Sequence, residues 1–168
     1  AASIWPFMGT FVYALDVDTG AVRWANDGTR AQFIKQPHSA DSFAGVGPQG
    51  ALVATEDLLL VPGGRSVPAA FDRHSGEFKY FHINAGGKGV GGSFVAANDD
   101  RFFVHTRGRG VRAFELGTGT KSNAVLDEPV LAGDRIYAAA ERPEDAVKFV
   151  QTFDRRLKAI GEFDADAS

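Results

Sequence analysis

A turn unit that occurs four times constrains the fold of this chain more than any other feature of its sequence. In the clearest copy an alternating apolar run ends at Asp16, and Thr19, Gly20 and Trp24 follow. An acidic side chain can accept backbone N–H bonds at the start of a turn, and Gly supplies the positive φ of a bulged hairpin. The unit therefore predicts a β-hairpin whose aromatic residue covers the next repeat.

The same unit recurs three more times with decreasing fidelity. The acidic anchors Asp16, Asp72, Glu115 and Asp154 are spaced 56, 43 and 39 residues apart. These intervals bracket the period of a four-stranded propeller blade, about 40–50 residues. The residues assigned to the repeat framework are Asp16, Thr19, Gly20, Trp24, Asp72, Gly76, Tyr80 and Gly119.

Another pair of short strands precedes each of the last three hairpins. These pairs are 51–55 with 58–61, 94–97 with 101–105, and 130–132 with 135–139, each joined by turn-forming residues. The predicted fold class is therefore all-β, a partial β-propeller of four-stranded antiparallel blades, about three and a half in number. We treat 1–168 as one propeller fragment with repeats at approximately 1–25 (a half blade), 50–83, 93–122 and 129–163.

The number of blades bears on what the chain associates with. Propellers typically close with about four to eight blades, because an open arc leaves its end faces unpaired. We expect the chain to be a fragment whose partners are the remaining blades of a longer chain. A homo-oligomer that closes the ring is the alternative.

Composition excludes several functional classes. The chain carries 18 basic and 21 acidic side chains, for a net charge of −3, so no general attraction to nucleic acid is expected. The absence of Cys excludes disulfides, thiolate metal sites and cysteine nucleophiles. No apolar run approaches the roughly 18 residues of a transmembrane helix, so no membrane span is expected.

The unit from Val12 to Trp24 resembles the repeat of PQQ-like β-propellers, a family of quinoprotein alcohol dehydrogenases and BamB-type outer-membrane assembly scaffolds. Segments 4–9, 35–45 and 61–68 are similar to a bacterial subgroup of PQQ-like repeat proteins. The resemblance implies that Gly20 and Trp24 are structural docking residues and that the protein is periplasmic or secreted. The dehydrogenases of this family hold PQQ on a central Ca²⁺ beside a catalytic Asp, and no position here matches that Asp or the Ca²⁺ ligands.

In a propeller, the link between the second and third strands lies on the same face as the link between blades. The link Asn26–Gly50 carries Lys35, His38 and Asp41. His38 and Asp41 could form a general-base pair or bind a ligand or metal with a third residue. Alternatively the link packs over the neighbouring blade, with Asp41 capping a turn. We favour the packing interpretation.

Two further links on that face carry basic residues. In Gly63-Gly64-Arg65-Ser66, backbone N–H groups beside a guanidinium make a candidate anion nest. Arg107 and Arg109 could face the ring axis and meet an anionic ligand, although solvated surface arginines are the simpler interpretation. The candidate ligand-binding residues are Lys35, His38, Asp41, Arg65, Ser66, Arg107 and Arg109. No catalytic or metal-binding residue is assigned.

The sequence thus predicts a non-enzymatic binding or scaffold module whose loop-rich face holds a protein partner or a small anionic ligand. No cofactor is expected on this chain. The alternative is a fragment of a PQQ-dependent oxidoreductase, and only then are PQQ and calcium expected. A dehydrogenase fragment should contribute acidic or amide Ca²⁺ ligands near the ring axis, whereas the links here are basic and Gly-rich.

Overall fold

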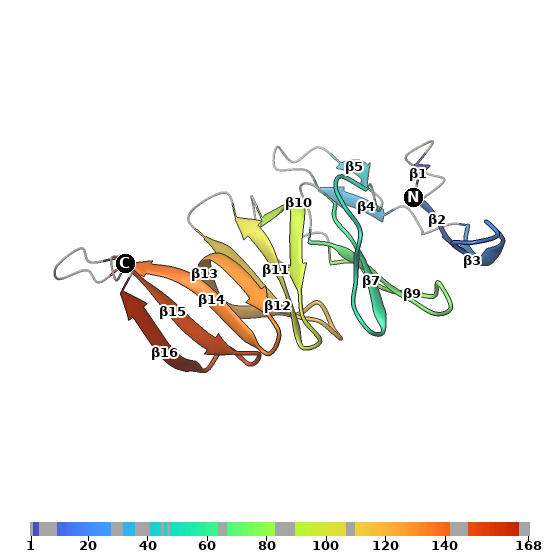
Figure 1. Ribbon diagram of the computed structural model, residues 1–168. Helices are drawn as coiled ribbons and strands as arrows, with labels where there is room; N and C mark the ends of the chain where they lie inside the picture. Colours follow the sequence, from blue (N-terminus) through green and yellow to red (C-terminus); the bar gives the residue numbers. More distant parts are fainter. Residues whose placement is uncertain are drawn as a thin grey trace.

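A computed structural model of the chain shows a row of antiparallel β-sheets and, among the residues it describes, no helix. The described residues are 2–3, 10–27, 32–35, 41–44, 46, 48–63, 67–82, 90–106, 110–141 and 148–164. Figure 1 shows the sheets following one another in chain order, from the N-terminal hairpin to the C-terminal strand. A search of this part of the chain finds no helix long and apolar enough to cross a membrane.

The first sheet, which we call blade 1, corresponds to the predicted half blade. Its strands are β1 (Ala2–Ser3), β2 (Thr10–Leu15) and β3 (Val22–Asn26), in the order β1-β2-β3. The hairpin of β2 and β3 is as predicted. Strand β1 adds a third strand to this hairpin through the pairing of Ala2 with Phe11.

A small hairpin follows within the link 26–50, where the sequence analysis assigned no strand. It consists of β4 (Gln32–Lys35) and β5 (Asp41–Ala44), which form a two-stranded sheet of their own. Farther along, the side chain of Val46 is buried in the cluster between blade 1 and the next sheet. This part of the link therefore packs on a neighbouring blade.

The remaining strands form three four-stranded units. Blade 2 consists of β6 (Val53–Ala54), β7 (Leu58–Val61), β8 (Ala69–Asp72) and β9 (Phe78–Tyr80). The next seven strands are β10 (Val90–Ala97), β11 (Arg101–Thr106), β12 (Val111–Glu115), β13 (Lys121–Ala132), β14 (Arg135–Glu141), β15 (Lys148–Asp154) and β16 (Ala159–Asp164).

Strand β13 belongs to two blades at once. Its first half pairs with β12, as Leu126 does with Val111, and its second half pairs with β14, as Val130 does with Tyr137. A register shift and a φ of 42° at Glu128 mark the junction. We call β10–β12 with 121–126 blade 3, and 127–132 with β14–β16 blade 4.

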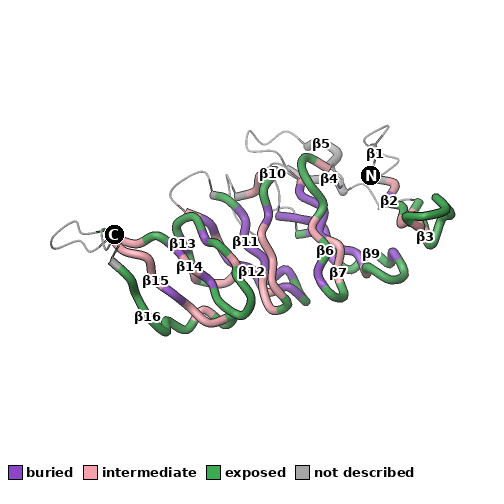
Figure 2. The backbone as a smooth tube through the Cα atoms, viewed as in Figure 1, coloured by how far each residue is buried: buried purple, intermediate pink, exposed green. Residues whose placement is uncertain are grey.

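Hydrophobic clusters lie between successive blades. Phe71 packs between blades 1 and 2, Phe102 and Phe114 between blades 2 and 3, and Phe103 between blades 3 and 4. Side chains alternate along a strand, so the neighbours Phe102 and Phe103 serve opposite faces of blade 3. Figure 2 shows buried residues in the middle of the row and mostly exposed residues along β3 and β16. These layers confirm the predicted fold class, an all-β partial propeller of four-stranded antiparallel blades.

Antiparallel pairing separates the chain reversals into two groups. The short turns after β2, β6, β8, β10, β12, β13 and β15 lie along one side, which we call the turn edge (lower side of Figure 1). The strand ends at Val61 and Ala69, and at Thr106 and Val111, lie on the other side, which we call the opposite edge. The opposite edge therefore borders the segments that carry Arg65 and Arg107.

Candidate functional site

Three turns on the turn edge share one backbone geometry. The N–H of Gly20 donates to the carbonyl oxygen of Asp16 at 2.9 Å, and the N–H of Asp16 donates to the carbonyl oxygen of Ala21 at 2.8 Å. The turns ending at Gly76 and Gly119 repeat both bonds. The three glycines have φ of 71°, 76° and 67°, the left-handed conformation that only Gly adopts without strain.

The first two turns are capped by their acidic side chains. Oδ1 of Asp16 accepts from the N–H of Thr19 at 3.0 Å and from its hydroxyl at 2.9 Å, and Asp72 accepts from Ser75 in the same way. The Arg23 guanidinium, 2.6 Å from Oδ2 of Asp16, and the Thr19 donors lower the pKa of Asp16 to about 2. The Ser75 donors lower the pKa of Asp72. Both carboxylates are held ionised by structural partners.

The third and fourth turns depart from this pattern. The sequence predicts that Glu115 caps its turn, but its carboxylate bonds Arg101 at 3.0 Å, because Arg101 is its cross-strand partner on β11, where blade 2 has Leu58 opposite Asp72. At the fourth turn, Oδ1 of Asp154 accepts from the N–H groups of Arg156 and Lys158. Leu157, with a φ of 67°, takes the left-handed position there.

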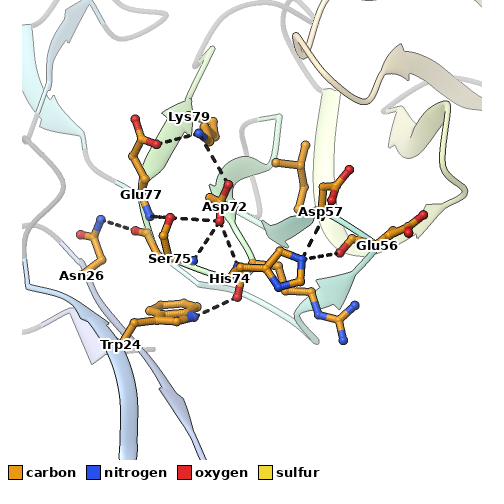
Figure 3. Close-up of polar contacts among 12 residues, drawn as sticks. Trp24, Asn26, Glu56, Asp57, Asp72, His74, Ser75, Glu77 and Lys79 are labelled. Atoms are coloured by element: carbon orange, nitrogen blue, oxygen red, sulfur yellow. Dashed lines mark hydrogen bonds and ion pairs between the residues drawn. The ribbon is translucent and has the colours of Figure 1, made fainter.

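Trp24 of blade 1 lies on the glycine turn of blade 2 (Figure 3). Its Nε1 donates to the carbonyl oxygen of Arg73 at 2.9 Å, and Nδ2 of Asn26 donates to that of Gly76 at 2.8 Å. A Cβ placed on Gly76 would overlap the indole ring. The Trp24 ring can therefore pack on this turn only because residue 76 has no side chain and adopts a backbone conformation that Gly permits.

Tyr80 of blade 2 makes the equivalent contact with blade 3. Its hydroxyl donates to the carbonyl oxygen of Leu116, and Nε2 of His82 donates to that of Thr118 at 2.9 Å. The Tyr80 and His82 rings are stacked, with centroids 5.5 Å apart. A Cβ on Gly119 would lie 2.6 Å from Tyr80 and 2.9 Å from His82. Burial of this contact raises the pKa of Tyr80.

Blades 3 and 4 are joined by different groups. Asn123 stands four residues after Gly119, where Trp24 and Tyr80 stand after their glycines. The facing turn of blade 4 carries Leu157, which packs against the cluster between these blades. Arg155 of this turn also lies 3.5 Å from a carboxylate oxygen of Asp100 of blade 3. The bulky side chain thus comes from the turn rather than from the preceding blade.

Of the seven candidate ligand-binding residues, two lie within the described residues and five lie outside them. His38, Arg65, Ser66, Arg107 and Arg109 lie outside the described residues. Lys35 ends β4 and Asp41 begins β5, and the register of this hairpin pairs their Cα atoms directly. The hairpin therefore brings together two of the seven residues proposed from the sequence.

Sequence analysis missed Asn26 and His82 as docking residues. Each stands two residues after the docking aromatic, at a spacing that both hairpins share. A comparison of the two hairpins could have found this position. It could not have supplied the acceptors, because those carbonyls lie 50 and 36 residues farther along the chain.

No protein-family model and no curated protein matches the chain. Its structure is similar to the computationally designed Ika8 protein, with a TM-score of 0.52, 12% identity, and coverage of 96% of this chain and 45% of Ika8. It also aligns with BamB from Moraxella catarrhalis (TM-score 0.47, 14% identity, 92% of this chain and 56% of BamB). The chain thus spans less than half the length of Ika8. At these identities the likeness concerns the fold, a propeller-like stack of antiparallel sheets.

We predict that Trp24→Ala lowers the free energy of unfolding by about 3 kcal/mol, the lower end of the range for Trp→Ala, because Trp24 is only partly buried. Trp24→Phe keeps a ring over Gly76 and loses the bond to Arg73, at a cost of about 1 kcal/mol. Urea denaturation measures both. A loss below about 1 kcal/mol for the alanine variant would contradict the docking role.

We predict that Gly76→Ala costs about 2–4 kcal/mol, from the left-handed φ together with overlap with Trp24. The control is Gly133→Ala. Gly133 has a φ of 58°, and no described atom lies within 4 Å of its Cβ position, so this change should cost only about 1 kcal/mol. Equal losses in thermal or urea unfolding would show that Trp24 does not press on Gly76.

The carboxyl of Asp16 should titrate near pH 2 in the folded protein, and Arg23→Gln should move this pKa up toward 3.8. Because the folded-state pKa is lowered, the stabilisation is complete above about pH 4 and is lost as the pH falls toward 2. Carboxyl NMR titration measures the shift, with Arg156→Gln as the control. An unchanged midpoint in Arg23→Gln would show that Arg23 is not the main cause.

Proposed function

We propose that this chain is a binding or scaffold module of the PQQ-like repeat type, which holds a protein partner or a small anionic ligand on its opposite edge. The supporting observation is that the two edges differ in how their side chains are used. Side chains on the turn edge are engaged in capping turns and in docking one blade on the next. Binding residues tend to lie on loops held by a rigid scaffold, and these loops extend from the opposite edge.

The basic residues of the opposite edge set the proposed ligand chemistry. Lys35 ends a strand of the β4–β5 hairpin, where its register partner is Asp41. Arg65 and Ser66 follow two glycines in the link between β7 and β8. Arg107 and Arg109 occupy the corresponding link of blade 3. Guanidinium and ammonium groups beside free backbone N–H groups favour carboxylate or phosphate.

A quinone cofactor held on calcium would require a set of oxygen ligands. Ca²⁺ takes about six to eight oxygen ligands. Within the described ranges, no three His, Asp or Glu side chains gather as a metal site requires. The carboxylates of Asp16 and Asp72 are committed to turn donors. We propose binding without PQQ chemistry because the links of the opposite edge are basic and Gly-rich in sequence. We propose a periplasmic or secreted location on the strength of the repeat resemblance.

The double change Lys35→Ala with Arg65→Ala should weaken binding of inorganic phosphate or citrate at least tenfold, about 1.4 kcal/mol, without lowering the melting temperature. Isothermal titration measures the first quantity and calorimetry the second. The control is Lys121→Ala with Arg156→Ala, two exposed basic residues at or beside turns of the turn edge.

Three results would count against the proposed function. Equal weakening in the control pair would indicate a general charge effect, and a matching fall in melting temperature would indicate a structural role. A saturable absorbance change on titration with PQQ and Ca²⁺ would favour the quinoprotein function instead.

A further inference from the structure

Blade 1 exposes an apolar sheet face that its counterparts in later blades bury. The residue before the acidic anchor is Leu15 in blade 1, Phe71 in blade 2 and Phe114 in blade 3. Leu15 is 57% exposed, whereas Phe71 and Phe114 are 0% exposed because the preceding blade covers them. Tyr13 and Val22 are also exposed and lie beside Leu15. We call Tyr13, Leu15 and Val22 the upstream face.

The glycine turn of blade 1 is open in the same way. Trp24 covers Gly76, and Tyr80 and His82 cover Gly119. Gly20 has the same turn geometry, yet no described atom lies within 4 Å of its Cβ position. In blades 2 and 3 this turn is covered by an aromatic side chain of the preceding blade. In blade 1 the turn at Gly20 is uncovered, and it lies beside the upstream face.

Blade 4 carries the complementary face at the other end of the row. Ile136 and Phe153 face blade 3, so the alternate residues of their strands face away from it. This outer side includes Val130 and Phe163, both largely exposed, and their cross-strand partners Tyr137 and Val150. We call these four residues the downstream face.

Phe163 occupies a docking position. Phe163 pairs with Val150, which stands four residues before the acidic anchor Asp154. In blade 1, Asn26 likewise pairs with Val12, four residues before the anchor Asp16. His82 stands at this position in blade 2 and contributes to the cover of Gly119. The residue two before it, at the Trp24 position, is Gly161, which leaves room above the sheet. An aromatic ring at position 163 can therefore reach a glycine turn placed against this face.

We propose that the upstream face of one copy of this chain docks on the downstream face of a second copy, with Phe163 of one copy over Gly20 of the other. Within the chain, the clusters between blades join a downstream face to the upstream face of the next blade. The same contact between copies is head-to-tail, and such contacts form a ring when the rotation closes. The described sheets of two copies, counting the three-stranded blade 1 of each, would supply eight blades, within the usual range of about four to eight.

Light scattering behind a sizing column tests the proposal on the full chain. The expected mass is twice 17.9 kDa. Leu15→Glu and Phe163→Glu should each halve it, because each buries a carboxylate in the contact. The matched control is Phe94→Glu in blade 3, since Phe94 is 60% exposed and Phe163 is 57% exposed. This control should keep the dimer mass, with an unchanged β-sheet circular dichroism spectrum in all variants.

Mixing the two disruptive variants tests the head-to-tail geometry. The Leu15→Glu chain keeps an intact downstream face and the Phe163→Glu chain an intact upstream face, so an equimolar mixture should recover the dimer mass. A dimer that joins two identical faces would instead survive in one of the variants alone, which would overturn the proposal. A wild-type chain that stays monomeric at about 100 μM would also overturn it, and would assign these faces to blades of another chain.

Discussion

An aromatic ring lying over a glycine of the next blade is the contact on which the row of sheets depends. Apolar burial alone is non-directional and would let one sheet slide over another. The N–H of Trp24 and the hydroxyl of Tyr80 each bond one carbonyl oxygen of the facing turn, which fixes the position of one blade on the next. Gly76 and Gly119 are required twice, for the left-handed turn and for the space that the ring fills.

The junction of blades 3 and 4 shows that this contact is a requirement for filled volume rather than for a particular residue. Where the preceding blade offers Asn123, the facing turn carries Leu157 in the left-handed conformation, in spite of the strain that a branched side chain suffers there. The guanidinium of Arg101 takes the place of the aromatic donor, because it donates to the carbonyl oxygen of Arg155 at 3.1 Å. The side chain of Arg155 adds ion pairs to Asp99 and Asp100. At this junction the bulky side chain belongs to the facing turn instead of the preceding blade, in keeping with the close packing of protein interiors.

Local chemistry explains why so much of the fold could be predicted from the sequence. Asp16, Thr19 and Gly20 act within one turn, so their spacing alone predicts the hairpin and its repeats. Contacts between distant segments could not be predicted in this way, since the carbonyl that Asn26 bonds lies 50 residues away. Glu115 has the charge of a capping residue, but its carboxylate bonds Arg101, the cross-strand partner that the sequence alone did not assign to it. For the candidate site, only the cross-strand pairing of Lys35 with Asp41 can be compared with the structure.

The same contacts limit where this chain can act on other molecules. The carboxylates of Asp16 and Asp72 accept several turn donors and have lowered pKa values, so they are weak proton acceptors and have few free lone pairs. Tyr80 is buried with its hydroxyl bonded, and its raised pKa keeps it neutral. Polar groups on the turn edge thus stabilise the stack, and the binding surfaces that we propose are the opposite edge and the two end faces. Among the described blades, Leu15 and Phe163 are exposed and Gly20 is uncovered at the two ends of the row, where a further blade of a repeat protein would dock.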